Sequence, residues 1–380
     1  MVDEPDAPAT PERGSLPSRA RTRAAGRDTA TMPSPPPAAE PEASPAPADR
    51  SWGAFGPRAP WVLPDEPLPW QAGLDAERAA LAAAVPELVA RRGLPPIGRL
   101  ARTVRVLAPQ LGAWAVGPRR AGGSPSRSDL AQRLRRAAAA LGPTYVKLGQ
   151  IISSGPGIFP DELVAELSLL RDRVPAEPFA EIRAVVEEDL GRPIAEVFAR
   201  FDRRPIAAAS IAQVHGATLL TGEDVVVKVQ RPTVRRRVHD DLRVMAWIAP
   251  SLVGRLPVSA LANPPALVEL FAETITEELD FRLEADNMVA VARSFVALGQ
   301  RGYTIPRPHP ELVTRRVLVM ERLRGFAFDD VVGMREAGID TEAIVRTGMV
   351  GFLEGCMFHG IFHGDLHGGN LLVLDDGTTG

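Results

Sequence analysis

The pattern of apolar and polar positions divides the chain into a start without periodicity, a helical part and a mixed part. Residues 1–50 are rich in proline and contain no aromatic residue. Such a segment cannot bury enough apolar surface to offset its ordering entropy, so we predict that it is disordered. From Trp52 to Trp70 aromatic residues appear among further prolines, and helical periodicity then predicts helices over 74–92 and 97–116.

Further along, the period changes from that of helices to that of strands. Gly142 and Pro143 interrupt one helix and start another, and more helices are predicted near 161–171, 178–190 and 264–295. IAAASIAQVHGATLL and VVVKVQ, joined by the turn residues TGED, predict two antiparallel strands. RRVLVME predicts another strand, and FHGDLHGGNLLVLDDG predicts a loop followed by a strand.

Composition and charge narrow the possible functions. The chain has 380 residues, 44 basic and 47 acidic, with a net charge of −3, which argues against non-specific nucleic-acid binding. The single cysteine, Cys356, excludes an internal disulfide and a cysteine-based zinc cluster. No stretch reaches the roughly 18 apolar residues needed to cross a bilayer. We therefore expect a cytoplasmic protein that is neither exported nor membrane-spanning.

The two lysines stand out because every other basic residue is arginine. Lys228 lies among the valines of VVVKVQ, where an unpaired ammonium would be costly. A strand lysine that pairs with a helix glutamate and with nucleotide phosphates is the protein-kinase arrangement. From these residues alone, it is about equally favoured that Lys228 lies on the solvent side of a half-buried strand. Likewise, Lys147 can be a lysine without a special role that remains by chance in an arginine-rich chain.

The segment HGDLHGGN offers two kinds of chemistry. Asp365 and Asn370 have the D-x4-N spacing of a kinase catalytic loop, where the carboxylate approaches the attacking group and the amide binds Mg²⁺. His359, His363 and His367 recur every four residues around Asp365, which also permits a metal site. The intervening glycines make one continuous helix improbable, so we favour His359 as a helix-end residue and His363 as an orienting group.

Six segments taken in order resemble the UbiB family, which are AarF-domain, atypical protein-kinase-like proteins. The resemblance covers about residues 141–374. The six segments are KLGQ (147–150), AAASIAQVH (207–215), VVVKVQRP (225–232), EELDFRLEA (277–285), RVLVME (316–321) and HGDLHGGN (363–370).

The resemblance implies an α+β, two-lobed kinase-like fold that uses ATP and Mg²⁺ and acts as an atypical kinase or ATPase. It implies that an N-terminal helical extension with the KxGQ segment lies across the nucleotide cleft. By carry-over, Lys228 contacts the phosphates and pairs with Glu284, Asp365 is the base or water-positioning carboxylate, and Asn370 binds Mg²⁺. The nucleotide would also contact Ala207, Ala208, Ala209, Ser210, Met320, Glu321 and Arg322, the last three through adenine.

The same resemblance assigns a regulatory group. Lys147 and Gln150 belong to the KxGQ segment, and Lys147 would meet Glu278 and Asp280. On one continuous helix with about 100° per residue, Asp280 and Glu284 lie about 40° apart, whereas Glu278 lies about 120° from Glu284. Unless the helix bends, Glu278 would then have to reach Lys147 from the flank of the helix.

Two departures from the family pattern affect these expectations. HGDLHGGN lacks the proline of the common HADPHPGN form, which predicts a more flexible loop with the same chemical groups. The chain ends at Gly380 without a DFG aspartate, so we expect an incomplete C-lobe. The expected parts are a disordered tail (1–51), a helical extension (52–140), the KxGQ segment with the N-lobe (141–322) and the start of the C-lobe (323–380).

The leading hypothesis is therefore an Mg-ATP-binding kinase or ATPase. By resemblance, it would support isoprenoid quinone or lipid metabolism, with an isoprenoid lipid or quinone-biosynthesis proteins as partners and with peripheral association at the inner face of a membrane. One alternative is a non-catalytic nucleotide-binding regulator. A second is a His/Asp metallohydrolase, in which the histidines around Asp365 would hold the metal.

Overall fold

A computed structural model describes residue 61 and residues 63–64, 66–91, 93–170, 175–254, 263–360 and 368–380. The predicted disordered segment 1–50 lies outside these residues. The first part described is helical, and its bounds agree closely with the periodicity of the sequence. It comprises η1 (Pro69–Gln71), α1 (Leu74–Leu88), α2 (Ile97–Val116), η2 (Pro118–Ala121), α3 (Gly123–Leu141), α4 (Pro143–Ser153), α5 (Asp161–Leu167) and α6 (Phe179–Leu190).

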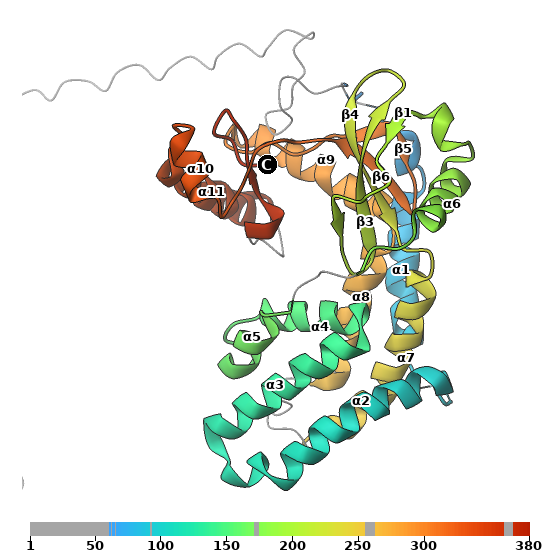
Figure 1. The fold of residues 1–380 in the computed structure, drawn as a ribbon, viewed down its shortest axis with the longest axis vertical. Helices are drawn as coiled ribbons and strands as arrows, with labels where there is room; N and C mark the ends of the chain where they lie inside the picture. The colour runs from blue at the N-terminus through green and yellow to red at the C-terminus, as the bar shows by residue number, and fades with distance from the viewer. Residues whose placement is uncertain are drawn as a thin grey trace, which may run out of the picture. The chain divides into compact units, whose positions relative to one another are not determined.

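An antiparallel sheet follows, with strand order β1-β3-β4-β6-β5 (Figure 1). The predicted strand pair is present and Val214 lies opposite Lys228. The two outer strands of the sheet, β1 and β5, were not predicted. β1 is short, and β5 begins with proline. The elements are η3 (Ile194–Glu196), β1 (Phe198–Phe201), β2 (Ala207–Ala208, paired only with β3), β3 (Ala212–Leu219), β4 (Asp224–Gln230), β5 (Pro308–Val313) and β6 (Val317–Glu321).

The two faces of the sheet pack against different helices, as the alternation of side chains along a strand requires. Val225, Val227 and Val229 of β4 are fully buried in one apolar cluster with the inner side of α6. The opposite face packs against α9 through residues such as Leu318. Lys228 alternates with the three valines and therefore projects from β4 on the side of α9.

The segment predicted as one helix over 264–295 is two helices, so that prediction was wrong. After α7 (Val234–Leu252), the chain forms α8 (Pro264–Glu278) and then α9 (Phe281–Ala297). The break falls at Leu279 and Asp280, and the Asp280 carboxylate accepts a hydrogen bond from the backbone N–H of Arg282 at 3.1 Å. Asp280 is thus the N-cap of a new helix.

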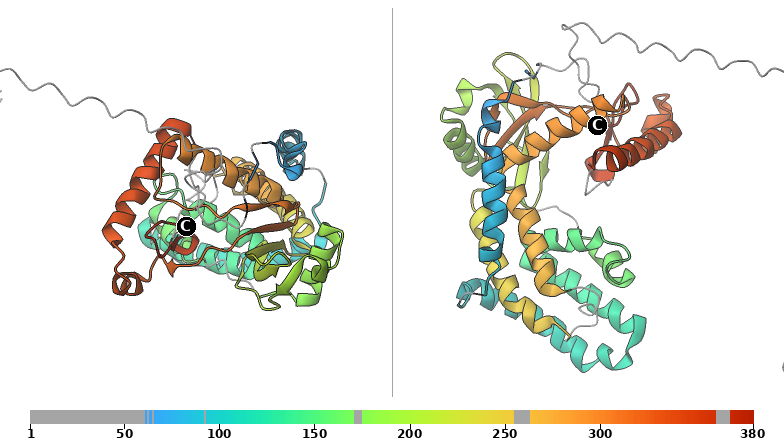
Figure 2. Two further views of the ribbon diagram at one scale, coloured as in Figure 1. Left: turned by 90° about the horizontal axis from the view of Figure 1, so that it is seen from above. Right: turned by 180° about the vertical axis from the view of Figure 1, so that it is seen from behind.

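The helical extension contacts the rest of the fold through α1 and α2. α1 contacts both α8 and α9, which Figure 2 shows from behind. α2 packs on α3 and α7, and Trp114 Nε1 of α2 donates to the backbone carbonyl oxygen of Ser126 at 3.1 Å. α2 is therefore in part a packing helix. Among the helices described, none is long and apolar enough to cross a membrane.

After β6 the described chain forms short elements. They are β7 (Phe326–Ala327), α10 (Val331–Glu336), α11 (Thr341–Glu354), the single π-helical turn η5 (Gly355–His359), η6 (Gly368–Asn370) and β8 (Leu372–Val373). β7 and β8 form a separate two-stranded antiparallel sheet. The predicted strand after HGDLHGGN is therefore present as β8.

Candidate active site

Lys228 on β4 and Glu284 in the first turn of α9 form the central contact of the site. Lys228 Nζ lies 2.7 Å from both carboxylate oxygens of Glu284 and 5.0 Å from the centroid of the Phe281 ring. The two side chains remain 23% and 36% exposed. A ligand can therefore reach the ammonium from solvent while the glutamate keeps it in place.

Lys147, from α4, forms a second ion pair beside the first. Its Nζ lies 2.9 Å from Oε1 of Glu278, the last residue of α8. Burial raises the pKa of the Glu278 carboxyl, while the ammonium groups of Lys147 and Lys228 lower it and the Glu284 carboxylate raises it further. The two ion pairs thus interact electrostatically. We call these four residues, Lys147, Glu278, Lys228 and Glu284, the charge cluster.

The break between α8 and α9 explains how Glu278 reaches this cluster. A continuous helix would have placed Glu278 about 120° from Glu284. Because α9 starts anew at Asp280, the two glutamates belong to different helices and that angle does not apply. The flank approach was expected only for a helix that does not bend, and the break removes that condition. The Lys147–Glu278 pair that the resemblance implied is present without it.

The resemblance implied a contact between Asp280 and Lys147, but Asp280 pairs with other residues. Its carboxylate is 2% exposed and forms ion pairs with Arg282 at 2.6 Å and with Arg315 at 3.4 Å. Arg315 also pairs with Glu77 of α1. Asp280 therefore joins α1, the start of α9 and the turn between β5 and β6.

This arginine-rich junction sets the position of Glu284. The backbone N–H of Phe281 donates to the carbonyl oxygen of Arg315 at 3.0 Å, and the Phe281 side chain is fully buried. Arg235 of α7 donates to the carbonyl oxygen of Leu279 at 3.1 Å. Burial lowers the pKa of the Arg235 guanidinium, and neighbouring Arg315 lowers it further. Both ends of the break are thereby fixed to other elements.

The alanine-rich run folds back along β3. Ala207 and Ala208 pair with Val214 and Gln213, and the Ala209 N–H donates to the Ala212 carbonyl oxygen at 2.9 Å. Ser210 is 2% exposed. The run thus lies at the edge of β3, the strand next to Lys228.

Met320, Glu321 and Arg322 were predicted to offer backbone hydrogen bonds to adenine. Met320 lies in the sheet between β4 and β5. The backbone N–H of Glu321 donates to Arg307 and that of Arg322 to Asp224, at 2.9 and 3.4 Å. The backbone N–H groups of Glu321 and Arg322 are therefore engaged within the protein, and the contact of these residues with adenine stays a prediction.

Two buried side chains were missed, although both lie in the motifs quoted above: Arg231 holds the alanine-rich run, and His215 contacts the chain at Asp202. Arg231 Nε donates to the Ala209 carbonyl oxygen at 2.9 Å, and its guanidinium pairs with Glu177 at 2.7 Å. His215 is fully buried, and Nδ1 lies 2.8 Å from the Asp202 carbonyl oxygen. Burial lowers the pKa of His215. The residue types in VQRP and AQVH were the available signal, but only the fold shows their partners.

The remaining predicted groups lie in or near the catalytic loop. Asp365, His363 and His367 lie outside the described residues, so the structure does not place them. Asn370 ends η6, and His359 ends the π-helical turn, as its predicted helix-end position requires. Gln150 lies one turn beyond Lys147 on α4 and is half-buried. Within the described ranges, no cluster of three or more histidine, cysteine or acidic residues could hold a metal ion.

The sheet order and the Lys228–Glu284 pair define a kinase-like fold, in which a strand lysine pairs with a glutamate of the adjacent helix. Comparisons with known proteins agree. Residues 169–379 match the ABC1 atypical kinase-like domain, and the chain belongs to this family.

Three relatives illustrate the similarity. An uncharacterized protein of Mycobacterium tuberculosis is 42% identical over 67% of this chain and 52% of its own length. A probable protein kinase UbiB of Pseudomonas putida is 37% identical, with 72% and 49% covered. An uncharacterized aarF domain-containing protein kinase, chloroplastic, of Arabidopsis thaliana is 37% identical, with 68% and 49% covered. The chain thus spans about half the length of these relatives, and the resemblance to the UbiB family is confirmed.

Proposed function

We propose that this protein is an Mg-ATP-binding atypical kinase or ATPase. The observation that supports the proposal is the charge cluster, which contains both lysines of the chain. A compact ammonium held by a carboxylate and still open to solvent is suited to bind nucleotide phosphates. In this proposal Lys228 binds the phosphates and Glu284 orients Lys228.

The roles of the other groups follow from their positions. The alanine-rich run beside Lys228 would cover the phosphates through its backbone. Asn370 would be a Mg²⁺ ligand, and Asp365 would position the attacking group. Mg²⁺ would neutralise charge that develops on the phosphates during transfer. Lys147, held by Glu278, would act as a lid over the cleft, with Gln150 one turn away.

Nucleotide binding is tested with Lys228→Arg. An arginine keeps the positive charge but replaces a compact ammonium with a planar fork, so we expect roughly tenfold weaker binding of Mg-ATP or more. Isothermal titration calorimetry measures this affinity. The matched control is Arg301→Lys, the reverse exchange at an exposed site with no ion pair among the described residues. Equal affinities of the Lys228→Arg variant and the parent would contradict the assignment.

Catalysis requires its own measurement. Mg-dependent phosphate release is compared between the parent and Asp365→Asn, and we expect release that depends on Asp365. Binding of nucleotide without such release would favour a non-catalytic regulator. Stoichiometric zinc that copurifies with the protein and is lost from variants at His363 and His367 would favour a metallohydrolase.

We further propose that the activity supports isoprenoid quinone or lipid metabolism, with an isoprenoid lipid as partner at the inner face of a membrane. The support is membership of the family and the UbiB name of a relative. A short-chain isoprenoid quinone analogue should then stimulate phosphate release. An unchanged rate over a full titration, with nucleotide binding intact, would contradict this part alone.

A further inference from the structure

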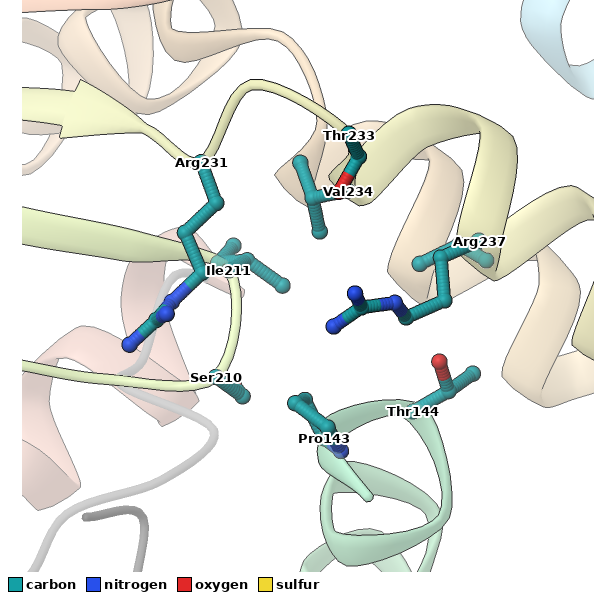
Figure 3. A pocket seen from close by; sticks show the side chains of 9 residues that line it. Pro143, Thr144, Ser210, Ile211, Arg231, Thr233, Val234 and Arg237 are labelled. Carbon is teal, nitrogen blue, oxygen red and sulfur yellow. The ribbon is translucent and has the colours of Figure 1, made fainter. Parts of the chain in front are cut away.

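A small pocket lies where α4, α7 and the end of the alanine-rich run meet. It has a volume of about 10 Å³, and its lining includes Pro143 and Thr144 from α4, Ser210, Thr233 just before α7, and Arg237 from α7 (Figure 3). This volume matches one water-sized group. The pocket is separate from the charge cluster, because none of the four cluster residues lines it.

Thr144 places an unsatisfied polar group in the pocket. The residue is 2% exposed, and among the described residues its Oγ1 has no hydrogen-bond partner. A buried hydroxyl without a hydrogen-bond partner destabilises the folded protein. An occupant that accepts or donates a hydrogen bond would remove this penalty, so the pocket is suited to a polar group.

Two helices begin at this pocket without a side-chain cap. α4 starts at Pro143 after Gly142, and α7 starts at Val234 after Thr233. The N-cap residues of these helices are Gly142 and Thr233. Neither residue forms a side-chain hydrogen bond to the first turn of its helix. Pro143 has no N–H, and the Val234 N–H donates to the Arg231 carbonyl oxygen at 3.1 Å. The remaining amides in the first turns of the two helices carry the partial positive charge that favours an anion between them.

Arg237 adds a full positive charge. Its guanidinium extends from α7 into the space between the elements in Figure 3. The side chain is exposed, and within the described part of the chain no ion pair involves it. Asp241, one turn further along α7, is 1% exposed and pairs with Arg99. Arg231, on the opposite side, pairs with Glu177 at 2.7 Å.

We propose that this pocket binds a phosphate group. One terminal oxygen would fill the cavity and accept a hydrogen bond from the Thr144 hydroxyl. The other oxygens would remain at the mouth, where they face Arg237 and the first turn of α7. The phosphate could belong to a free anion or to the phosphomonoester headgroup of a lipid, because both present the same terminal oxygens.

Inorganic phosphate is the first probe. Titration calorimetry at constant ionic strength, with sodium chloride as the balancing salt, should show binding by the full chain. Lys228→Gln removes the proposed phosphate contact of the nucleotide site, so phosphate binding that remains in this variant reports on the pocket. Loss of phosphate binding in Lys228→Gln would overturn the proposal, whatever the outcome for nucleotide.

Two variants remove the proposed contacts. Arg237→Gln and Thr144→Val should each weaken phosphate binding roughly tenfold, since each removes a hydrogen bond to a charged group. Arg236→Gln is the matched control, because Arg236 is exposed on the same turn and does not line the pocket. Thr144→Val should not lower the thermal midpoint without phosphate, because it removes an unpaired hydroxyl. Equal affinity for Arg237→Gln and Arg236→Gln would overturn the proposal.

The source of the phosphate is distinguished with soluble glycerol 1-phosphate and with phosphatidylcholine vesicles that contain phosphatidic acid. If the phosphate comes from a soluble molecule, glycerol 1-phosphate should compete with inorganic phosphate for the pocket. The parent should then bind the vesicles no better than Arg237→Gln does. A lipid source requires vesicle binding that Arg237→Gln reduces and Arg236→Gln retains. Failure of every probe to bind in an Arg237-dependent way would overturn the proposal.

Discussion

Substitutions at Asp280 separate a structural role from a role in the lid. The carboxylate caps α9 and forms ion pairs with Arg282 and Arg315, whereas Lys147 pairs with Glu278. Asp280→Asn keeps an oxygen that can cap the helix but removes the charge. Asp280→Ala removes both, so the pair of variants measures the two contributions separately.

The expected magnitudes follow from the geometry. Loss of an N-cap costs about 1 kcal/mol. Breaking a buried ion pair costs about 3–5 kcal/mol, but Arg315 is 39% exposed and solvent screens part of its charge. We therefore expect about 2–3 kcal/mol for Asp280→Asn and about 3–4 kcal/mol for Asp280→Ala.

Urea denaturation followed by circular dichroism measures these values, and Mg-ATP affinity is measured in parallel under native conditions. We expect Asp280→Asn to retain nucleotide affinity within about threefold, a change of under 1 kcal/mol. A loss of less than about 1 kcal/mol in stability, together with a large change in nucleotide affinity, would refute the structural role. Asp280 would then act in the lid, as the resemblance implied.

Two further predictions concern α4 and Glu278. Gly149→Ala should destabilise the protein by about 1–2 kcal/mol in urea denaturation, since its Cβ would lie 2.3 Å from a methyl group of Leu170. Gly112→Ala, in a helix with open space around the position, should instead stabilise it by about 0.5–1 kcal/mol, and equal signs for the two changes would contradict the packing argument. Burial raises the pKa of the Glu278 carboxyl above its ordinary 4.5. The stability that this carboxyl contributes to the folded protein is therefore fully present below pH 4.5 and is lost as the pH rises through the pKa of the folded state. The difference in unfolding free energy between the parent and Glu278→Gln should therefore decrease above pH 4.5, and a difference that increases with pH would contradict the assigned direction.

Local patterns predicted much of the fold because period and burial agree there. The alternation in VVVKVQ placed three valines on one face of β4 and Lys228 on the other. The bounds of 97–116 match α2 because Gly117 ends an uninterrupted periodic stretch. β5 was not predicted, since its prolines weaken the strand pattern even though they lie at positions that a terminal strand of the sheet tolerates.

The break at Asp280 shows what the sequence could not predict. Apolar periodicity continues from α8 into α9, so a single helix was the simpler interpretation. Asp280 ends one helix and starts the next because its carboxylate pairs with the neighbouring Arg282 and with Arg315 of the turn between β5 and β6, which also accepts a hydrogen bond from the Phe281 N–H. Arg315 lies far from Asp280 along the chain, and the two meet only because β5 and β6 pair in the folded sheet.

The same break determines how changes in chain length would act on the site. Glu284 lies four residues after Asp280, and the contact between Phe281 and Arg315 anchors the start of α9 to the sheet. Insertions or deletions between α7 and α8 would therefore be absorbed before the break and leave the carboxylate facing Lys228. One residue inserted between Asp280 and Glu284 would instead rotate the carboxylate by about 100° around the helix axis. Natural or engineered length variation is thus compatible with the site on one side of the break and incompatible with it on the other.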